Sequence, residues 1–106
     1  MKLTLPILTI AATVFAVGAF AFDPDDLQRL KDTGDCVECD LMGANLEGAG
    51  LFKANLEGAN LENAVLMGAD LSRSNLKDAN LERAGLNGAI LCNTTMPDGS
   101  VIYSGC

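Results

Sequence analysis

Leucine recurs at every fifth position from Leu41 to Leu91, and Met96 takes the next slot in the series. A small residue, most often Ala, stands two positions before each of these residues, and Asn or Asp usually lies between the two. A period of five matches neither the 3.6 residues of an α-helix nor the two-residue alternation of a strand. The predicted core positions are Leu41, Leu46, Leu51, Leu56, Leu61, Leu66, Leu71, Leu76, Leu81, Leu86, Leu91 and Met96.

Each five-residue unit has two consistently apolar positions, one large and one small, and three polar or variable ones. If the chain turns a corner at every unit, four units close a square, and successive squares pair their backbones about 4.8 Å apart. Leucines then stack on leucines and small residues on small residues. A single unit cannot bury its apolar side chains but a stack can, so the pattern predicts an all-β solenoid.

The run ANLEGANLENAVLMGADLSRSNLKDANLERA lies within twelve consecutive units at residues 39–98 and resembles the pentapeptide-repeat family. This resemblance implies a right-handed quadrilateral β-helix with about twenty residues per coil, so twelve units correspond to about three coils. Residues 33–41 and 91–99 also resemble exported members of the family from cyanobacteria and thylakoid lumens.

The segments on either side of the repeat are predicted to cover its ends, which would otherwise expose apolar core and unpaired strand edges. Asp23 is a favourable N-cap, Pro24 suits the first helical position, and Gly34 is a plausible stop. Residues 22–38 are therefore expected to form a short capping helix and the segment leading into the coils. Residues 99–106, which include Val101, Ile102 and Tyr103, are expected to form the C-terminal cap.

Residues 1–21 are predicted to be a signal peptide. They contain Lys2, an apolar run and the small-x-small sequence Ala19-Phe20-Ala21, which places cleavage after Ala21. A retained membrane anchor is the alternative, because residues 3–22 are nearly long enough to span a bilayer. We expect an exported protein, in a periplasm, in a thylakoid lumen or secreted, with no membrane segment in its mature form.

The net negative charge of the chain limits the kinds of partner that it is expected to bind. Without Lys2 the mature chain has 6 basic and 14 acidic side chains, a net charge of −8. Nucleic-acid phosphates need Lys and Arg, so nucleic acid is not expected as a partner. The charge is compatible with a basic protein partner or simply with solubility.

The four cysteines of this small exported chain are expected to form disulfides. Four cysteines allow three pairings. In the three-coil arrangement the N-terminal and C-terminal cysteines lie about two coils, or roughly 10 Å, apart. A disulfide requires Cα atoms within about 7 Å, which favours Cys36–Cys39 and Cys92–Cys106. No metal site is expected, because the chain has no His and a four-Cys zinc site would need both ends together.

Cys36-x-x-Cys39 also has the spacing of a thiol–disulfide redox motif. That motif normally starts a helix in a βαβ unit, which this sequence does not indicate. The flanking Asp35, Glu38 and Asp40 would raise thiol pKa values, which disfavours a reactive thiolate. A structural disulfide is the preferred interpretation.

One side of the predicted solenoid has few charges and is a candidate interaction face. The alternative is that its glycines simply suit the turns. Its members are Val65, Met67, Gly48, Gly68 and Gly88.

The sequence contains no catalytic arrangement, so we expect a non-enzymatic structural or protein-interaction module without a cofactor. A thiol–disulfide protein using Cys36 and Cys39 is one alternative. The resemblance suggests another, a DNA mimic like the family members that protect DNA gyrase from quinolones. Those proteins are longer and cytoplasmic, and Phe often fills their central slot, whereas Phe52 is predicted to point outward here.

Overall fold

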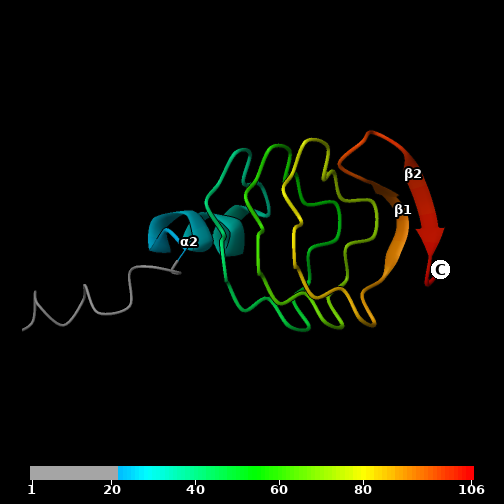
Figure 1. Cartoon of the computed structure of the whole chain (residues 1–106), viewed down its shortest axis with the longest axis horizontal. Helices are drawn as coiled ribbons and strands as arrows, with labels where there is room; N and C mark the ends of the chain where they lie inside the picture. The colour runs from blue at the N-terminus through cyan, green and yellow to red at the C-terminus, as the bar shows by residue number, and fades with distance from the viewer. Residues whose placement is uncertain (1–21) are drawn as a thin grey trace, which may run out of the picture.

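The computed structural model of the protein describes residues 22–106, so the predicted signal peptide lies outside the described residues. The described chain begins with helix α2, Pro24–Thr33, and ends with two strands, β1, Leu91–Thr95, and β2, Val101–Ser104. Between them the chain winds through stacked coils, with α2 at one end of the stack and the β1–β2 pair at the other (Figure 1). No helix in the described part of the chain is long and apolar enough to cross a membrane.

The coils are held together by parallel bridges between residues twenty positions apart. The amide of Leu61 donates to the carbonyl of Asn80 in the following coil at 2.8 Å. The amide of Asn60 donates back to the carbonyl of Cys39 in the preceding coil, also at 2.8 Å. The same pattern repeats along the stack, which makes the fold a β-solenoid. The bridged pairs are Asp35 with Asn55, Asp40 with Asn60, Asn45 with Val65, Gly50 with Asp70, Asn55 with Asn75, Asn60 with Asn80, Val65 with Gly85, Asp70 with Ile90, and Asn75 with Thr95.

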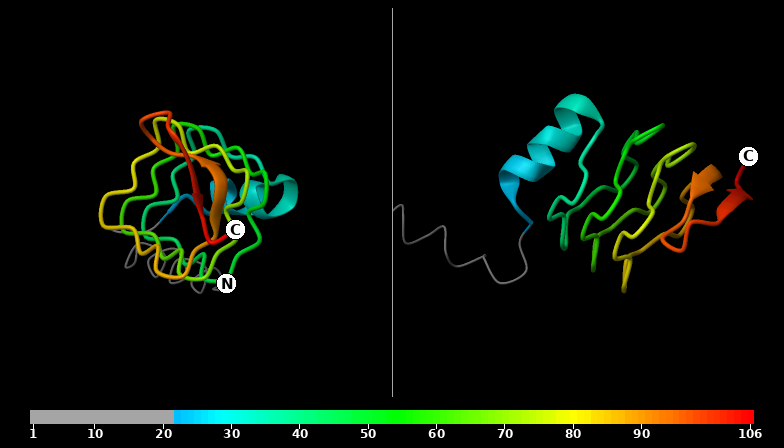
Figure 2. Two further views of the ribbon diagram at one scale, coloured as in Figure 1. Left: turned by 90° about the vertical axis from the view of Figure 1, so that its right-hand side faces the viewer. Right: turned by 90° about the horizontal axis from the view of Figure 1, so that it is seen from above.

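Each corner is a four-residue turn that begins at the large inward residue. In the turn 41–44 the Ala44 amide donates to the Leu41 carbonyl at 3.0 Å. The third residue of the turn, Gly43, has φ +70°, as a type II turn requires at this position. The Asn or Asp residue before the turn supports it with its side chain: Asn60 Oδ1 accepts the Glu62 amide at 3.1 Å. Viewed along the stack, successive corners give the coils a four-cornered outline (Figure 2).

The inward leucines and small residues form one continuous core. From Leu41 to Leu76 the large side chains are buried, and Leu81, Leu86, Leu91 and Met96 are only partly buried. Two small slots hold hydroxyl residues in place of Ala. Ser74 Oγ and Thr94 Oγ1 both donate to the Leu71 carbonyl at 2.7 Å, so these buried polar groups are satisfied.

Helix α2 covers the N-terminal end of the stack. Asp23 caps it by accepting the Asp25 amide at 2.9 Å, and Gly34 ends it with φ +79°. The Asp40 carbonyl accepts from the Asp23 amide at 3.0 Å, and the Asp40 amide donates to Asp26 Oδ2 at 2.9 Å. The helix segment therefore supplies the hydrogen-bond partners that a preceding coil would otherwise provide on this side.

The paired units begin one unit earlier than the predicted start of the repeat at Cys39. Asp35 bridges to Asn55, and the amide of Cys36 donates to the Asn55 carbonyl at 2.7 Å. Cys36 is fully buried in a large inward slot. The leucine pattern misses this unit because Cys replaces Leu there.

Residues 99–106 lie at the C-terminal end of the stack and cover part of it. Strand β2 pairs with β1 in an antiparallel register that shifts between Cys92 and Thr94. It therefore covers the backbone edge of β1. Val101 and Tyr103, expected to cover the core, are exposed, and only Ile102 is partly buried. Leu81 and Leu86 are left partly open because β2 runs along β1 rather than across the whole end of the stack.

This difference between the ends predicts unequal effects of the same truncation. Leu61 and Leu81 occupy the same side of the solenoid, one fully buried and the other partly exposed. Leu61→Ala should lower the free energy of unfolding by about 2–5 kcal/mol, because it leaves a cavity in a closed core. Leu81→Ala should lower it less. Urea denaturation followed by circular dichroism measures both, and an equal or larger loss for Leu81→Ala would contradict this account of the core.

Candidate functional site

The disulfide Cys36–Cys39 lies directly beneath helix α2. The two Cα atoms are 5.3 Å apart, and the two residues are 0% and 1% exposed. The carbonyl oxygen of Asp26 lies 3.1 Å from Cys36 Sγ, and Arg29 Nη2 lies 2.7 Å from Cys39 Sγ. Both sulfur atoms are thus covered by side-chain and backbone groups of the helix.

Arg29 changes the electrostatic argument made from the sequence. The residues adjacent to the cysteines are acidic, but the helix places a guanidinium 2.7 Å from Cys39 Sγ. A cation at this distance would favour a thiolate at Cys39 if the bond were reduced. Thiol–disulfide exchange nevertheless requires a thiolate to reach a sulfur atom, and α2 covers both. The burial weighs against the redox alternative.

The second disulfide, Cys92–Cys106, joins β1 to the C-terminal residue. Its Cα atoms are 5.0 Å apart, and Cys106 is exposed. The bond closes a loop of residues 92–106, for which chain entropy gives a stabilisation of about 3 kcal/mol. The two bonds account for all four cysteines of the sequence.

The structure places the five residues of the candidate interaction face on one side of the solenoid. Val65 bridges to Asn45 before it and Gly85 after it, and the side is formed by the units of Leu46, Leu66 and Leu86. Met67 is 43% exposed and Val65 is partly buried. We refer to Val65, Met67, Gly48, Gly68 and Gly88 as the glycine face.

The three glycines occupy the corner position with positive φ, at +67°, +69° and +74°. On other sides the same position accepts larger residues, such as Lys53 with φ +62° and Arg73 with φ +61°. A Cβ at Gly48 or Gly68 would meet no atom within 4 Å. Neighbouring atoms therefore do not require these glycines. The turn conformation favours them, and the outward side chains of these corners are those one position earlier, Glu47, Met67 and Asn87.

Phe52 and Arg83, on other sides of the solenoid, each have a local partner. Phe52 is 53% exposed, and the Lys53 ammonium lies 5.4 Å from the centre of its ring. Arg83 forms an ion pair with Glu62 and donates to Asn63 Oδ1 at 3.2 Å. Glu62 and Glu82 stand twenty positions apart and so lie in adjacent coils, and the Arg83 guanidinium offsets the repulsion between these like charges.

The pKa values of two carboxyl groups are lowered from their ordinary values. Hydrogen bonds from the hydroxyl and then the amide of Ser72 lower the pKa of Asp70, and those from Ser100 do the same for the pKa of Asp98. Both pairs stabilise turns. Among residues 22–106 there is no pocket and no group of three metal-ligating side chains.

The comparison with protein families adds to this geometry. The family model described as pentapeptide repeats, with eight copies, matches residues 51–88 and 59–96. The chain belongs to the pentapeptide-repeat family. No curated protein matches the sequence.

Solved structures of pentapeptide-repeat proteins from cyanobacteria are similar to parts of this chain. HetL from Nostoc sp. strain PCC 7120, described as involved in the regulation of heterocyst differentiation, is 33% identical over 64% of this chain, with a TM-score of 0.43. Rfr23 from Cyanothece 51142 is 44% identical over 52%, with a TM-score of 0.34. The protein alr5209 from Nostoc PCC 7120 is 26% identical over 71% of this chain and 79% of its own length, with a TM-score of 0.43. The matches span only 40% of HetL and 34% of Rfr23.

The environments of the two disulfides predict an order of reduction. In folded protein treated with dithiothreitol, Cys92–Cys106 should open first, because Cys106 is exposed while Cys36 and Cys39 are buried under α2. Alkylation at timed intervals followed by peptide mass spectrometry identifies the labelled cysteines. Earlier labelling of Cys36 and Cys39 would show that α2 does not shield that bond.

Proposed function

We propose that this pentapeptide-repeat protein is an exported, non-enzymatic interaction module. Its architecture is a right-handed, four-sided β-helix of about three coils, with α2 as the N-terminal cap. The observation that carries the proposal is the glycine face, where an exposed Met67 stands beside a row of three glycines. The partner is a protein that binds this face.

The repeat itself supports a binding role rather than a chemical one. The large and small inward positions are taken up by the core, and the Asn and Asp positions support the corners. Differences between one such protein and another are therefore confined to the outward positions and the ends. Repeat solenoids commonly bind partners through such extended surfaces.

Export is supported by the leader-like residues 1–21 together with the disulfides. Both bonds fasten an end of the stack, one beneath α2 and one at the C-terminus. Disulfides persist in oxidising compartments and are rare in the cytosol. A periplasm, a thylakoid lumen or the extracellular space would each maintain them.

The chemistry of the glycine face indicates the kind of partner. The row of Gly48, Gly68 and Gly88 allows a partner's backbone or flat side chains to approach closely, and the side chains of Met67 and Val65 offer apolar contact. Methionine is adaptable in such contacts because its side chain is flexible and polarisable. The net charge of −8 for residues 22–106 favours a partner with basic residues around its apolar contact.

The test compares two exposed apolar residues on different sides. Met67→Lys should abolish retention of a partner from an extract of the exported compartment, because it places a charge in the centre of the glycine face. Phe52→Lys, which changes an exposed apolar residue outside this face, should retain it. Affinity capture with quantitative mass spectrometry makes the comparison. A partner lost equally from both variants, or from neither, would contradict binding through the glycine face.

A further inference from the structure

The last coil ends in a row of backbone groups that have no partner among the described residues. They lie on the two sides formed by residues 79–88. The equivalent groups one coil earlier are paired with the coil that follows: the Leu61 amide donates to the Asn80 carbonyl at 2.8 Å, and the Ala59 carbonyl accepts from the Asn80 amide at 2.9 Å. The groups without a partner are the amides of Leu81, Arg83, Leu86 and Gly88 and the carbonyls of Ala79 and Ala84.

The same two sides leave apolar side chains partly uncovered. Leu81 and Leu86 are partly exposed. Their counterparts one coil earlier, Leu61 and Leu66, are both 0% exposed. An added strand satisfies such an edge, because its main chain pairs with the unpaired groups and its alternate side chains cover the apolar ones. Residues 79–88 therefore form a strand-binding edge, which we call the open edge.

The C-terminal segment of the chain is held away from the open edge. A further coil would place Ser100 beside Asn80, in the twenty-residue register of the bridges. Instead, the Met96 amide donates to the Ser100 carbonyl at 2.7 Å, and β2 returns along β1. The Cys92–Cys106 disulfide fastens the last residue of this segment to β1. The chain's own path therefore leaves the open edge uncovered.

The hydrogen-bonding polarity of the open edge argues against a matching edge of a second copy. The edge presents four donors and two acceptors, so two such edges face to face would set donors against donors. The complement of the edge is the opposite end of a coil, which is rich in acceptors. Toward the preceding coil, for example, the carbonyls of Asn80 and Glu82 both accept, and the Asn80 amide donates.

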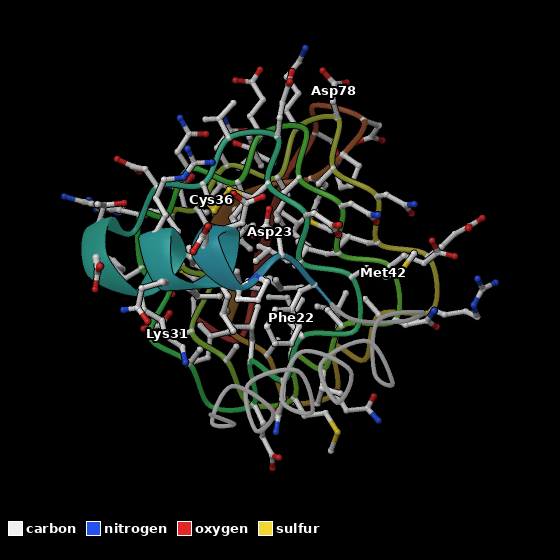
Figure 3. The ribbon with its side chains drawn as sticks, turned by 90° about the vertical axis from the view of Figure 1, so that its left-hand side faces the viewer. Phe22, Asp23, Lys31, Cys36, Met42 and Asp78 are labelled. Atoms are coloured by element: carbon white, nitrogen blue, oxygen red, sulfur yellow. A yellow bond between two sulfur atoms is a disulfide. The ribbon has the colours of Figure 1, made fainter. Side chains whose placement is uncertain are left out.

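Helix α2 lies between the acceptor-rich end of this chain and any second copy. Leu30 is buried in the core, against which Phe22 and Leu27 also pack. Figure 3 looks onto this end and shows α2 lying over the coils beside Phe22 and Cys36. Stacking two copies head to tail would require the helix to leave. The occupant that fits the open edge is therefore a segment of another protein.

We propose that the open edge binds an extended segment of a partner protein as an added half coil. The segment runs parallel to residues 79–88, in the register by which each coil follows the one before. Its backbone accepts from the four unpaired amides and donates to the carbonyls of Ala79 and Ala84. It has two large apolar residues five positions apart, which cover Leu81 and Leu86, and a small residue two positions before each.

This binding site goes beyond the proposed function. The glycine face consists of outward positions along one side of the stack, whereas the open edge is the end of the last coil. The two surfaces have only Gly88 in common. They would bind different parts of a partner, or different partners, and each can be tested without the other.

The experiment adds a synthetic peptide with the sequence of residues 79–88, blocked at both ends, to the purified, oxidised protein. This sequence fits the edge because residues 79–88 themselves follow residues 59–68 in the required register. Amide exchange is measured by NMR. When about nine tenths of the protein is occupied, exchange at the four unpaired amides should slow about tenfold, since only the free tenth exposes them. The amides of Leu61 and Leu66, already paired, should not change.

A matched pair of methylated peptides tests the register without altering the protein. Methyl groups on the peptide nitrogens equivalent to those of Asn80 and Gly85 remove the donors to Ala79 and Ala84. They should weaken binding about tenfold, the effect of two lost hydrogen bonds. Methyl groups on the nitrogens of the two peptide leucines should leave the affinity nearly unchanged, because these nitrogens face away from the protein in a parallel half coil.

Three results would overturn the proposal. The first is unchanged exchange at the four amides up to about 5 mM peptide, a range that includes weak, millimolar association. The second is equal weakening by both methylation patterns, which would contradict the parallel register. The third is loss of peptide binding in Met67→Lys, which would assign the peptide to the glycine face. A peptide that binds Met67→Lys and wild-type protein equally supports a separate site.

Discussion

The pairing of backbone groups between coils is the interaction on which the rest of the structure depends. A buried amide or carbonyl without a partner carries a desolvation cost of about 1–3 kcal/mol, and the described solenoid contains hardly any regular strand within which to satisfy such groups. Each unit instead pairs backbone amides and carbonyls with those of the following coil and of the preceding coil. The bridged residues are twenty positions apart. The narrow spacing that this pairing imposes restricts the interior to one large and one small side chain per unit.

The same interaction makes the two ends of the stack different from its middle. At the N-terminal end, Asp23 and Asp26 replace the missing coil for one residue, Asp40. At the C-terminal end, β2 replaces it only along β1. The features that distinguish this protein from a plain repeat are therefore at the ends and on the outward rows. They are the two disulfides, the N-terminal helix α2 and the glycine face.

Much of the solenoid could be predicted from the sequence, because the five-residue pattern reports directly on which side chains point inward. The helix was predictable from Asp23, Pro24 and Gly34, which act through local backbone chemistry. Three features were not predictable. The unit that contains Cys36 lacks the leucine that marks the repeat, because Cys36 occupies the large inward position. The contact of Arg29 with Cys39 depends on how the helix packs against the first coil. The exposure of Val101 and Tyr103 depends on the path of β2. Each depends on tertiary geometry that no local pattern records.

Amide hydrogen exchange tests the central claim most directly, because equivalent units differ only in whether a following coil is present. The amides of Leu61 and Leu66 donate to Asn80 and Gly85, whereas those of Leu81 and Leu86 have no hydrogen-bond partner among the described residues. The account predicts strong protection of Leu61 and Leu66 and fast exchange at Leu81 and Leu86. Similar protection at all four amides would contradict the claim that pairing between coils is what stabilises the stack.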